Sequence, residues 1–207
     1  MEQLPLDILS PAPADFGNFI PGRNAEALAR VRELAAGRLH EPIVYLWGER
    51  GSGKTHLLTA ARCANPLLVI ADDVAALDAE GQQALFIAIN AAREGEPKVL
   101  AAGADAPGGL ALREDLRTRL ASGLVYRLDP LSDAEKAEYL RAEGLRRGMP
   151  LPAEVVAYLL NHLPRDFASL AAVLDVLDRH ALARQRPLTI PFVREALYGR
   201  REAKKQQ

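Results

Sequence analysis

Residues 48–55 (GERGSGKT) constrain this chain more than any other stretch, because they fit the pattern G-x-x-x-x-G-K-[ST] at every fixed position. The preceding residues 43–47 (IVYLW) predict a short buried strand, and residues 56–64 continue as a helix. A glycine-rich loop between a strand and a helix points backbone N–H groups at phosphate oxygens. The sequence therefore predicts a phosphate-binding P-loop; the alternative is a glycine-rich turn that fits the pattern by chance.

The residue types in this loop suit the binding of a nucleotide phosphate. Glycine permits tight wrapping of the backbone, and the positive end of the following helix favours an anion. Lys54 is expected to reach the β- and γ-phosphates, and the Thr55 hydroxyl is expected to ligate Mg²⁺. The candidate nucleotide-binding residues of the loop are Gly48, Gly51, Ser52, Gly53, Lys54 and Thr55.

A second motif follows the P-loop helix. Residues 67–71 (LLVIA) predict a strand that runs directly into Asp72 and Asp73. An apolar strand ending in acids downstream of a P-loop is the Walker B pattern. We expect Asp72 to hold the Mg²⁺ shell through water, and Asp73 to act as the carboxylate that polarises the attacking water. The alternative is a strand that ends in a solvated aspartate turn.

The chain up to Pro130 alternates strands with helices, which predicts an α/β fold with a parallel sheet. In such sheets, sites gather at the carboxyl ends of the strands. Gly48, Asp72 and Asp105 all follow predicted strands, so we expect them to lie near one another. Besides the elements named above, we predict helices at 24–39 (capped by Asn24), 79–94 and 113–122, and strands at 98–103 and 124–128.

Only helical patterns follow Pro130. Ser132 and Glu135 form a capping box, the signature of a helix start. Thr189 is expected to cap the last helix. The predicted helices, which form a small all-helical lid, cover residues 132–148, 153–163, 166–184 and 189–199.

We divide the chain into four parts. Residues 1–15 contain three prolines and several turn formers, so they predict an extended arm. Residues 16–130 are the nucleotide-binding domain, residues 131–200 the helical lid domain, and residues 201–207 a basic, frayed tail.

Composition excludes several classes of protein. A net charge of −1 over 207 residues gives no electrostatic reason to expect strong direct binding to nucleic acid. No apolar run is long enough for a membrane span, and no signal pattern begins the chain. Cys63 is the only cysteine, which fits a reducing, cytoplasmic setting.

With these motifs in order, the chain resembles the AAA+ class, and within it the DnaA-related proteins, most of all the Hda regulators that inactivate DnaA. The resemblance covers nearly the whole chain. Its most particular stretches are residues 16–24 (FGNFIPGRN), 119–132 (RLASGLVYRLDPLS) and 187–197 (PLTIPFVREAL).

The resemblance implies roles for residues that the motifs alone do not assign. The segment of residues 19–24 (FIPGRN), which carries Pro21, Gly22 and Asn24, is expected to pack around adenine. Asp105 resembles the sensor I residue and Arg119 the arginine finger; the alternatives are a turn cap and one more surface charge. Arg165 resembles the sensor II arginine of the lid. A cation at a helix N-terminus opposes the helix dipole, so a nearby anionic ligand would explain its position.

The arm resembles the family's short motif for docking on the DNA polymerase sliding clamp. Its docking residues would be Gln3, Leu4, Leu6, Ile8 and Leu9. The alternative is an arm that folds back, for instance over an exposed sheet edge.

The implied function is a regulator that binds ADP or ATP with Mg²⁺ and, with the DNA-loaded clamp, stimulates hydrolysis of ATP bound to DnaA. Such a regulator would thereby repress re-initiation of chromosome replication. The implied partners are DnaA, the clamp and, in a homo-oligomer, other copies of the chain. The sequence shows neither the N-terminal domain nor the helix-turn-helix domain of an initiator, which favours the regulator. The alternative is a self-sufficient P-loop ATPase or a nucleotide kinase.

The chain departs from the family pattern between the P-loop helix and the Walker B strand. Related proteins have a strand and a helix there, whereas residues 64–66 alone make the connection here. We therefore expect an AAA+ sheet shortened by one strand, with residues 67–71 at its edge.

Overall fold

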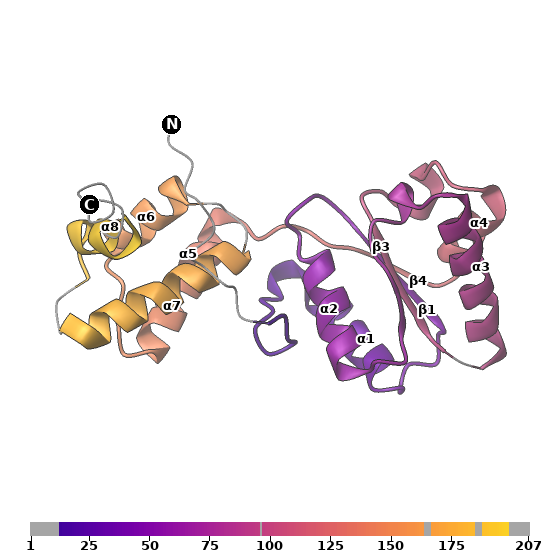
Figure 1. Ribbon diagram of the computed structural model, residues 1–207, viewed down its shortest axis with the longest axis horizontal. Coiled ribbons are helices and arrows are strands. Elements are labelled where there is room, and N and C mark those ends of the chain that lie inside the picture. Colours follow the sequence, from indigo (N-terminus) through magenta and orange to yellow (C-terminus); the bar gives the residue numbers. More distant parts are fainter. Residues whose placement is uncertain (1–12, 96, 164–166, 185–187, 199–207) are drawn as a thin grey trace, which may run out of the picture. The chain divides into compact units, whose positions relative to one another are not determined.

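The computed structural model describes residues 13–95, 97–163, 167–184 and 188–198 (Figure 1). The chain divides into two compact units at the boundary between Pro130 and Leu131. One unit contains the sheet and its covering helices, and the other is built from helices. The prediction of an α/β fold followed by a helical lid is confirmed.

All strands of the α/β unit belong to one parallel sheet of order β2-β3-β1-β4. The register of the central pair runs from Ile43 opposite Val99 to Trp47 opposite Gly103. Both central strands are almost completely buried, which explains their continuous apolar sequences. The strands are β1 (Ile43–Trp47), β2 (Val69–Ala71), β3 (Val99–Gly103) and β4 (Leu124–Arg127).

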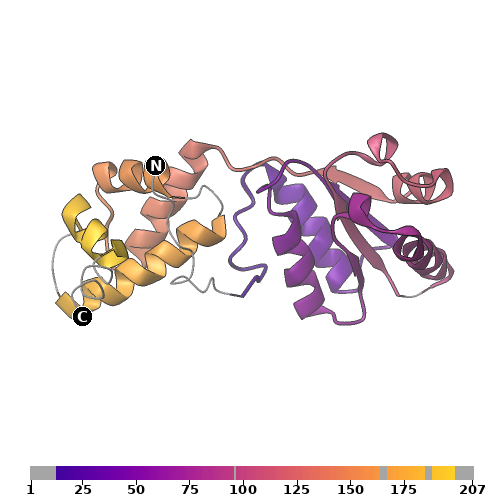
Figure 2. The ribbon, with the colours of Figure 1, turned by 45° about the horizontal axis from the view of Figure 1, so that its top comes forward.

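Helices cover both faces of the sheet, α1 and α2 on one face and α3 and α4 on the other (Figure 1). Figure 2 shows α1 and α2 running side by side. The helices are α1 (Ala25–Ala35), α2 (Lys54–Ala64), α3 (Ala79–Glu94) and α4 (Glu114–Ala121). Short 3-10 turns are η2 (Gly22–Asn24), η3 (Val74–Ala76) and η4 (Pro107–Gly109).

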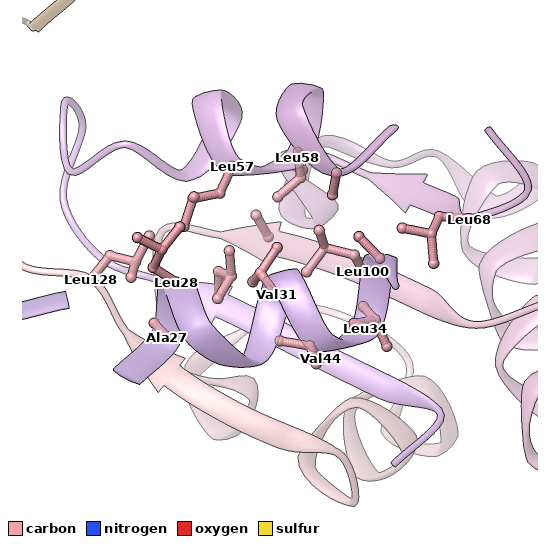
Figure 3. Packing of buried hydrophobic residues seen from close by; sticks show 14 of the residues in the cluster. Ala27, Leu28, Val31, Leu34, Val44, Leu57, Leu58, Leu68, Leu100 and Leu128 are labelled. Atoms are coloured by element: carbon pink, nitrogen blue, oxygen red, sulfur yellow. The ribbon is translucent and has the colours of Figure 1, made fainter. Parts of the chain in front are cut away.

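The core beneath α1 and α2 follows from their apolar spacing. Val31 and Leu34 of α1 and Leu57 of α2 are completely buried against Val44 and Leu100 of the sheet (Figure 3). Burying one such side chain is worth roughly 1.5–3 kcal/mol. This packing holds the start of α2, and with it the P-loop, over the carboxyl ends of the central strands.

The edge position predicted for the Walker B strand is confirmed, because β2 pairs only with β3 within the described part of the chain. The predicted strand over residues 67–71 is too long, since β2 begins at Val69. Asn65 accounts for the difference. Its side-chain oxygen accepts the N–H of Leu67 at 3.1 Å, and its carbonyl accepts the N–H of Leu68 at 3.2 Å. A turn therefore occupies these two leucines.

Asn24 lies at the N-cap position of α1, as predicted, but its side chain does not cap the helix. Its side chain makes no hydrogen bond to the first turn of α1. Instead its amide nitrogen donates to the carbonyl of Asp129 at 2.8 Å, and its oxygen accepts the Asp129 N–H at 2.9 Å. Asn24 is thus a buried link between the segment before α1 and the chain that leaves β4.

The helical unit comprises α5 (Asp133–Arg146), α6 (Ala153–His162), α7 (Phe167–Arg184) and α8 (Ile190–Tyr198). The capping box predicted from Ser132 and Glu135 is present at the start of α5. The core of this unit includes Leu140, Val155, Leu159, Leu170, Leu174, Leu177 and Val193. No helix within the described ranges is long and apolar enough to cross a membrane.

Candidate functional site

The P-loop joins β1 to α2 in a conformation that requires glycine. Gly48, Gly51 and Gly53 have φ angles of 145°, 84° and 97°. At these angles the backbone of a residue with a side chain would be strained. A Cβ atom on Gly48 would lie 2.2 Å from the carbonyl oxygen of Leu128. Ser52 is buried within the loop. The tight wrapping predicted from the sequence is present.

Lys54, the first residue of α2, lies over the loop that precedes it. Its ammonium donates to the carbonyls of Gly48 at 2.7 Å and of Glu49 at 2.9 Å. Partial burial lowers the pKa of Lys54, and the carboxylates of Asp72 and Asp73 oppose that shift. The positive charge is therefore held between the P-loop backbone and the Walker B acids, where a terminal phosphate would meet it.

Thr55 and Asp72, the predicted Mg²⁺ ligands, are in direct contact. The Thr55 hydroxyl donates to Oδ2 of Asp72 at 2.7 Å. The described ranges contain no cluster of three or more histidine, cysteine or acidic side chains that could hold a metal. Mg²⁺ in phosphate sites usually takes one or two protein oxygens and fills its octahedron with phosphate and water. The hydroxyl and carboxylate present here fit that donor set.

Asp73 stands out by its backbone. It is the only described residue other than glycine with a positive φ, 45°. Its side chain is exposed, and its N–H donates to Oδ1 of Asp72 at 2.9 Å. Left-handed conformations of residues other than glycine cost roughly 1–3 kcal/mol and cluster at functional sites. This supports a functional role for the second acid.

Asp105 lies in the segment that leaves β3, next to the P-loop. The N–H of Gly48 donates to the carbonyl of Ala104 at 3.2 Å, and the Tyr45 hydroxyl donates to the carbonyl of Asp105 at 2.8 Å. Burial raises the pKa of Tyr45 strongly, and the charges of Asp105 and Asp73 raise it further. Both carboxylates are therefore electrostatically close to this hydroxyl. The contact between Tyr45 and Asp105 was not predicted from the sequence, because Tyr45 has the residue type of an ordinary strand position.

The predicted adenine segment, residues 19–24, lies against the P-loop through its first residue, Phe19. The ring of Phe19 is buried, and a Cβ atom on Gly53 would lie 2.7 Å from it. The same ring is 5.5 Å from that of His56, centroid to centroid. Pro21 and Gly22 lead from Phe19 into η2.

Arg119 lies on α4 and takes no part in the P-loop contacts described above. It lines an open groove of about 360 Å³ with Phe86 of α3 and Asp115 of α4. Its guanidinium makes no hydrogen bond or ion pair with a described residue, whereas Arg113 pairs with Asp115 at 2.5 Å and bonds Gln83 at 2.6 Å. Two further predicted groups, Arg165 and the arm residues between Gln3 and Leu9, lie outside the described residues.

A family model described as the lid domain of Hda matches residues 133–197, from the start of α5 to one residue before the end of α8. Solved structures match the wider chain. Domain III of the replication initiation protein DnaA from Thermotoga maritima is 19% identical, with a TM-score of 0.68, over 92% of this chain and 98% of that one.

Two further structures show the same fold. AMPPCP-bound DnaA from Aquifex aeolicus is 20% identical, with a TM-score of 0.67, over 97% of this chain and 71% of that one. The Holliday junction branch migration motor RuvB from Thermotoga maritima is 15% identical, with a TM-score of 0.60, over 89% of this chain and 71% of that one. The helical unit thus matches the Hda lid domain over residues 133–197, and the chain shares the AAA+ fold of these solved structures.

Proposed function

We propose that this chain is a cytoplasmic regulator of DnaA that binds ADP or ATP with Mg²⁺. With the DNA-loaded sliding clamp it stimulates hydrolysis of DnaA-bound ATP, and it thereby represses re-initiation of chromosome replication. The observation that carries the proposal is Arg119, a cation in an open groove without a side-chain partner among the described residues. An arginine that serves another subunit has to be available in this way.

Nucleotide binding rests on the residues that converge at the carboxyl ends of β1, β2 and β3. Lys54 would neutralise the terminal phosphates, and the loop N–H groups together with the start of α2 would hold them. Thr55 and Asp72 would hold Mg²⁺, which when bound neutralises charge on the phosphate oxygens. The similar DnaA from Aquifex aeolicus was solved with the nucleotide analogue AMPPCP, which supports the same ligand class here.

Action on a second protein rests on α4. In phosphoryl transfer, a guanidinium supplied from another subunit is worth roughly 10³–10⁵ in rate. Arg113 is held by Asp115 and Gln83, so its charge is engaged within the unit. Arg119 lines an open groove and has no such partner among the described residues, so its charge would be available to a nucleotide on DnaA. The groove between α3 and α4 would receive part of that partner.

The division of the chain into parts, the arm and the lid complete the proposal. The arm (residues 1–15) would dock on the clamp, the nucleotide domain would cover residues 16–130 and the lid residues 131–200, and residues 201–207 would remain a basic tail. Arg165 would reach the nucleotide from the lid. Gln3 and the arm's leucines would enter preformed pockets of the clamp, with little ordering cost where proline restricts the chain.

ATP turnover tests the proposal directly. Phosphate release is measured for the chain alone, for ATP-loaded DnaA alone, for both together, and for both with a DNA-loaded clamp. We expect the last mixture to be fastest by at least tenfold, with little turnover by the chain alone. Equal rates of phosphate release from ATP-loaded DnaA with and without the chain would contradict the proposed action on DnaA.

The alternative, a self-sufficient ATPase, has a specific observation in its favour. Asp73, which follows Asp72, has a strained backbone conformation. Asp105 lies just after the end of β3, the strand next to β2. Fast turnover by the chain alone, abolished by Asp73→Asn and indifferent to DnaA, would establish this second function instead.

A further inference from the structure

Tyr45 makes a contact that its place in the sheet does not require. Its ring is fully buried in the core under α3 and α4, with Val74 and Ala101 in the same cluster. Its hydroxyl reaches the carboxyl end of the sheet, where it donates to the carbonyl oxygen of Asp105 at 2.8 Å. A phenylalanine would fill the core equally well, so the hydroxyl itself needs an explanation.

The neighbouring strand is shaped around this hydroxyl. A Cβ atom on Gly103 would lie 2.3 Å from the Tyr45 oxygen and 3.3 Å from Val74. Only glycine at this position leaves room for the hydroxyl to pass. Gly103 is also the last residue of β3, directly before the segment that carries Asp105.

A second bond fixes the same segment to the P-loop. The Gly48 N–H donates to the carbonyl of Ala104 at 3.2 Å. Two successive carbonyls, those of Ala104 and Asp105, are thus held by donors from β1 and from the first residue after it. The segment after β3 and the P-loop are therefore tied together by backbone contacts.

We propose that Tyr45 is a positioning residue, whose hydroxyl holds the backbone of Asp105 so that its carboxylate faces the terminal phosphate of the bound nucleotide. This inference rests on the proposed nucleotide site and deepens it. A carboxylate at that place would distinguish a nucleotide with a γ-phosphate from one without. Its negative charge would interact with the additional phosphate and with the Mg²⁺ bound to that phosphate. Without the Tyr45 hydroxyl, the carbonyl of Asp105 loses its donor and the segment is free to shift.

The test is a comparison of two affinities in the full chain. The dissociation constants of ADP and AMPPCP, each with Mg²⁺, are measured by calorimetry for the wild type, Tyr45→Phe, Asp105→Ala and the double variant. Tyr126→Phe is the matched control, since its hydroxyl lies 3.3 Å from Glu26 on the other face of the sheet. Thermal melts of all variants show which of them are folded.

We expect Asp105→Ala to change the AMPPCP-to-ADP affinity ratio. Tyr45→Phe should change it in the same direction by roughly three- to tenfold, the worth of one hydrogen bond. The double variant should match Asp105→Ala alone, and Tyr126→Phe should match the wild type. If Tyr45 had only a structural role, Tyr45→Phe would lower the melting temperature and weaken the binding of ADP and AMPPCP equally.

Three results would overturn the inference. The ratio for Tyr45→Phe could stay within twofold of the wild type, the two substitutions could add independently, or Asp105→Ala could leave the ratio unchanged. A wild-type chain that binds neither nucleotide gives a different result, since it removes the proposed nucleotide site and this inference together.

Discussion

The hydroxyl of Thr55 donates a 2.7 Å hydrogen bond to Oδ2 of Asp72, seventeen residues further along the chain. This bond joins the first turn of α2 to the end of β2, although β2 lies two strands away from β1 in the sheet. Parallel pairing aligns the carboxyl ends of the strands, and the connection between α2 and β2 is short. The two motifs therefore meet at one place.

Asp72→Asn should separate metal-dependent binding from binding as such. The amide keeps the shape of the carboxylate but loses the charge that an Mg²⁺ ion requires. We expect ADP affinity with Mg²⁺ to fall about tenfold or more, and affinity in EDTA to stay within twofold of the wild type. Calorimetric titrations under both conditions measure this. Equal losses with and without Mg²⁺ would show that Asp72 does not act through the ion.

Lys54→Ala should abolish or strongly weaken binding of both ADP and ATP while the fold remains. The ammonium bonds only to loop carbonyls and the nearby Ser52 among the described residues, so its loss removes little packing. Lys136→Ala, a lysine of the helical unit, is the matched control. Titration calorimetry measures the affinity for each nucleotide, and a thermal melt shows whether the variant is folded. Unchanged affinity in Lys54→Ala would remove the P-loop assignment.

Arg119→Ala is expected to keep nucleotide and clamp binding but to lose stimulation of DnaA-bound ATP hydrolysis, by roughly 10³-fold if the arginine acts as a finger in trans. Arg117→Ala serves as the comparison, because Arg117 is also partly exposed on α4 but does not line the groove. Normal stimulation by Arg119→Ala, with failure of Arg117→Ala, would transfer the role to Arg117.

The helical unit should lose stability in acid through Glu143. Hydrogen bonds from Arg146, and then from Arg147, lower the pKa of Glu143 from its usual 4.5 to about 2. Because the folded pKa is depressed, the stabilisation is complete above pH 4.5 and is lost as the pH falls toward 2. Glu143→Gln should cost about 1–2 kcal/mol at pH 7.

The measurement is urea unfolding followed by circular dichroism across this pH range. The difference between the wild type and Glu143→Gln should shrink between pH 4.5 and pH 2. Glu138→Gln changes an exposed glutamate of the same helix and should leave the profile unaltered. A constant difference across the range would contradict the ion-pair account.

Deleting residues 1–9 should abolish clamp binding without lowering the melting temperature. The apolar residues of this arm are expected to enter pockets of the clamp, since extended segments bind in that way. Surface plasmon resonance against immobilised clamp measures the binding. Retained clamp binding together with a lower melting temperature would instead show that the arm packs on its own chain.

Features that depend on residues close together in the sequence could be predicted. Glycine spacing and the flanking apolar runs determined the P-loop, and the acids after β2 determined the Walker B position. The helix α3 (Ala79–Glu94) has the predicted bounds, and the capping box of α5 is present. These features are governed by backbone conformation and by hydrophobic period, which a short window of sequence carries.

Tertiary structure alone decided the contacts between distant residues. Tyr45 and Asp105 are sixty residues apart, and Asn24 and Asp129 are 105 apart, yet both pairs are hydrogen-bonded. Asn24 has the residue type of a helix cap, and only its packed surroundings direct its side chain to Asp129. Which donor meets which carbonyl depends on the order of strands and on the helices that cover them, because sheet packing brings together residues that no local pattern relates.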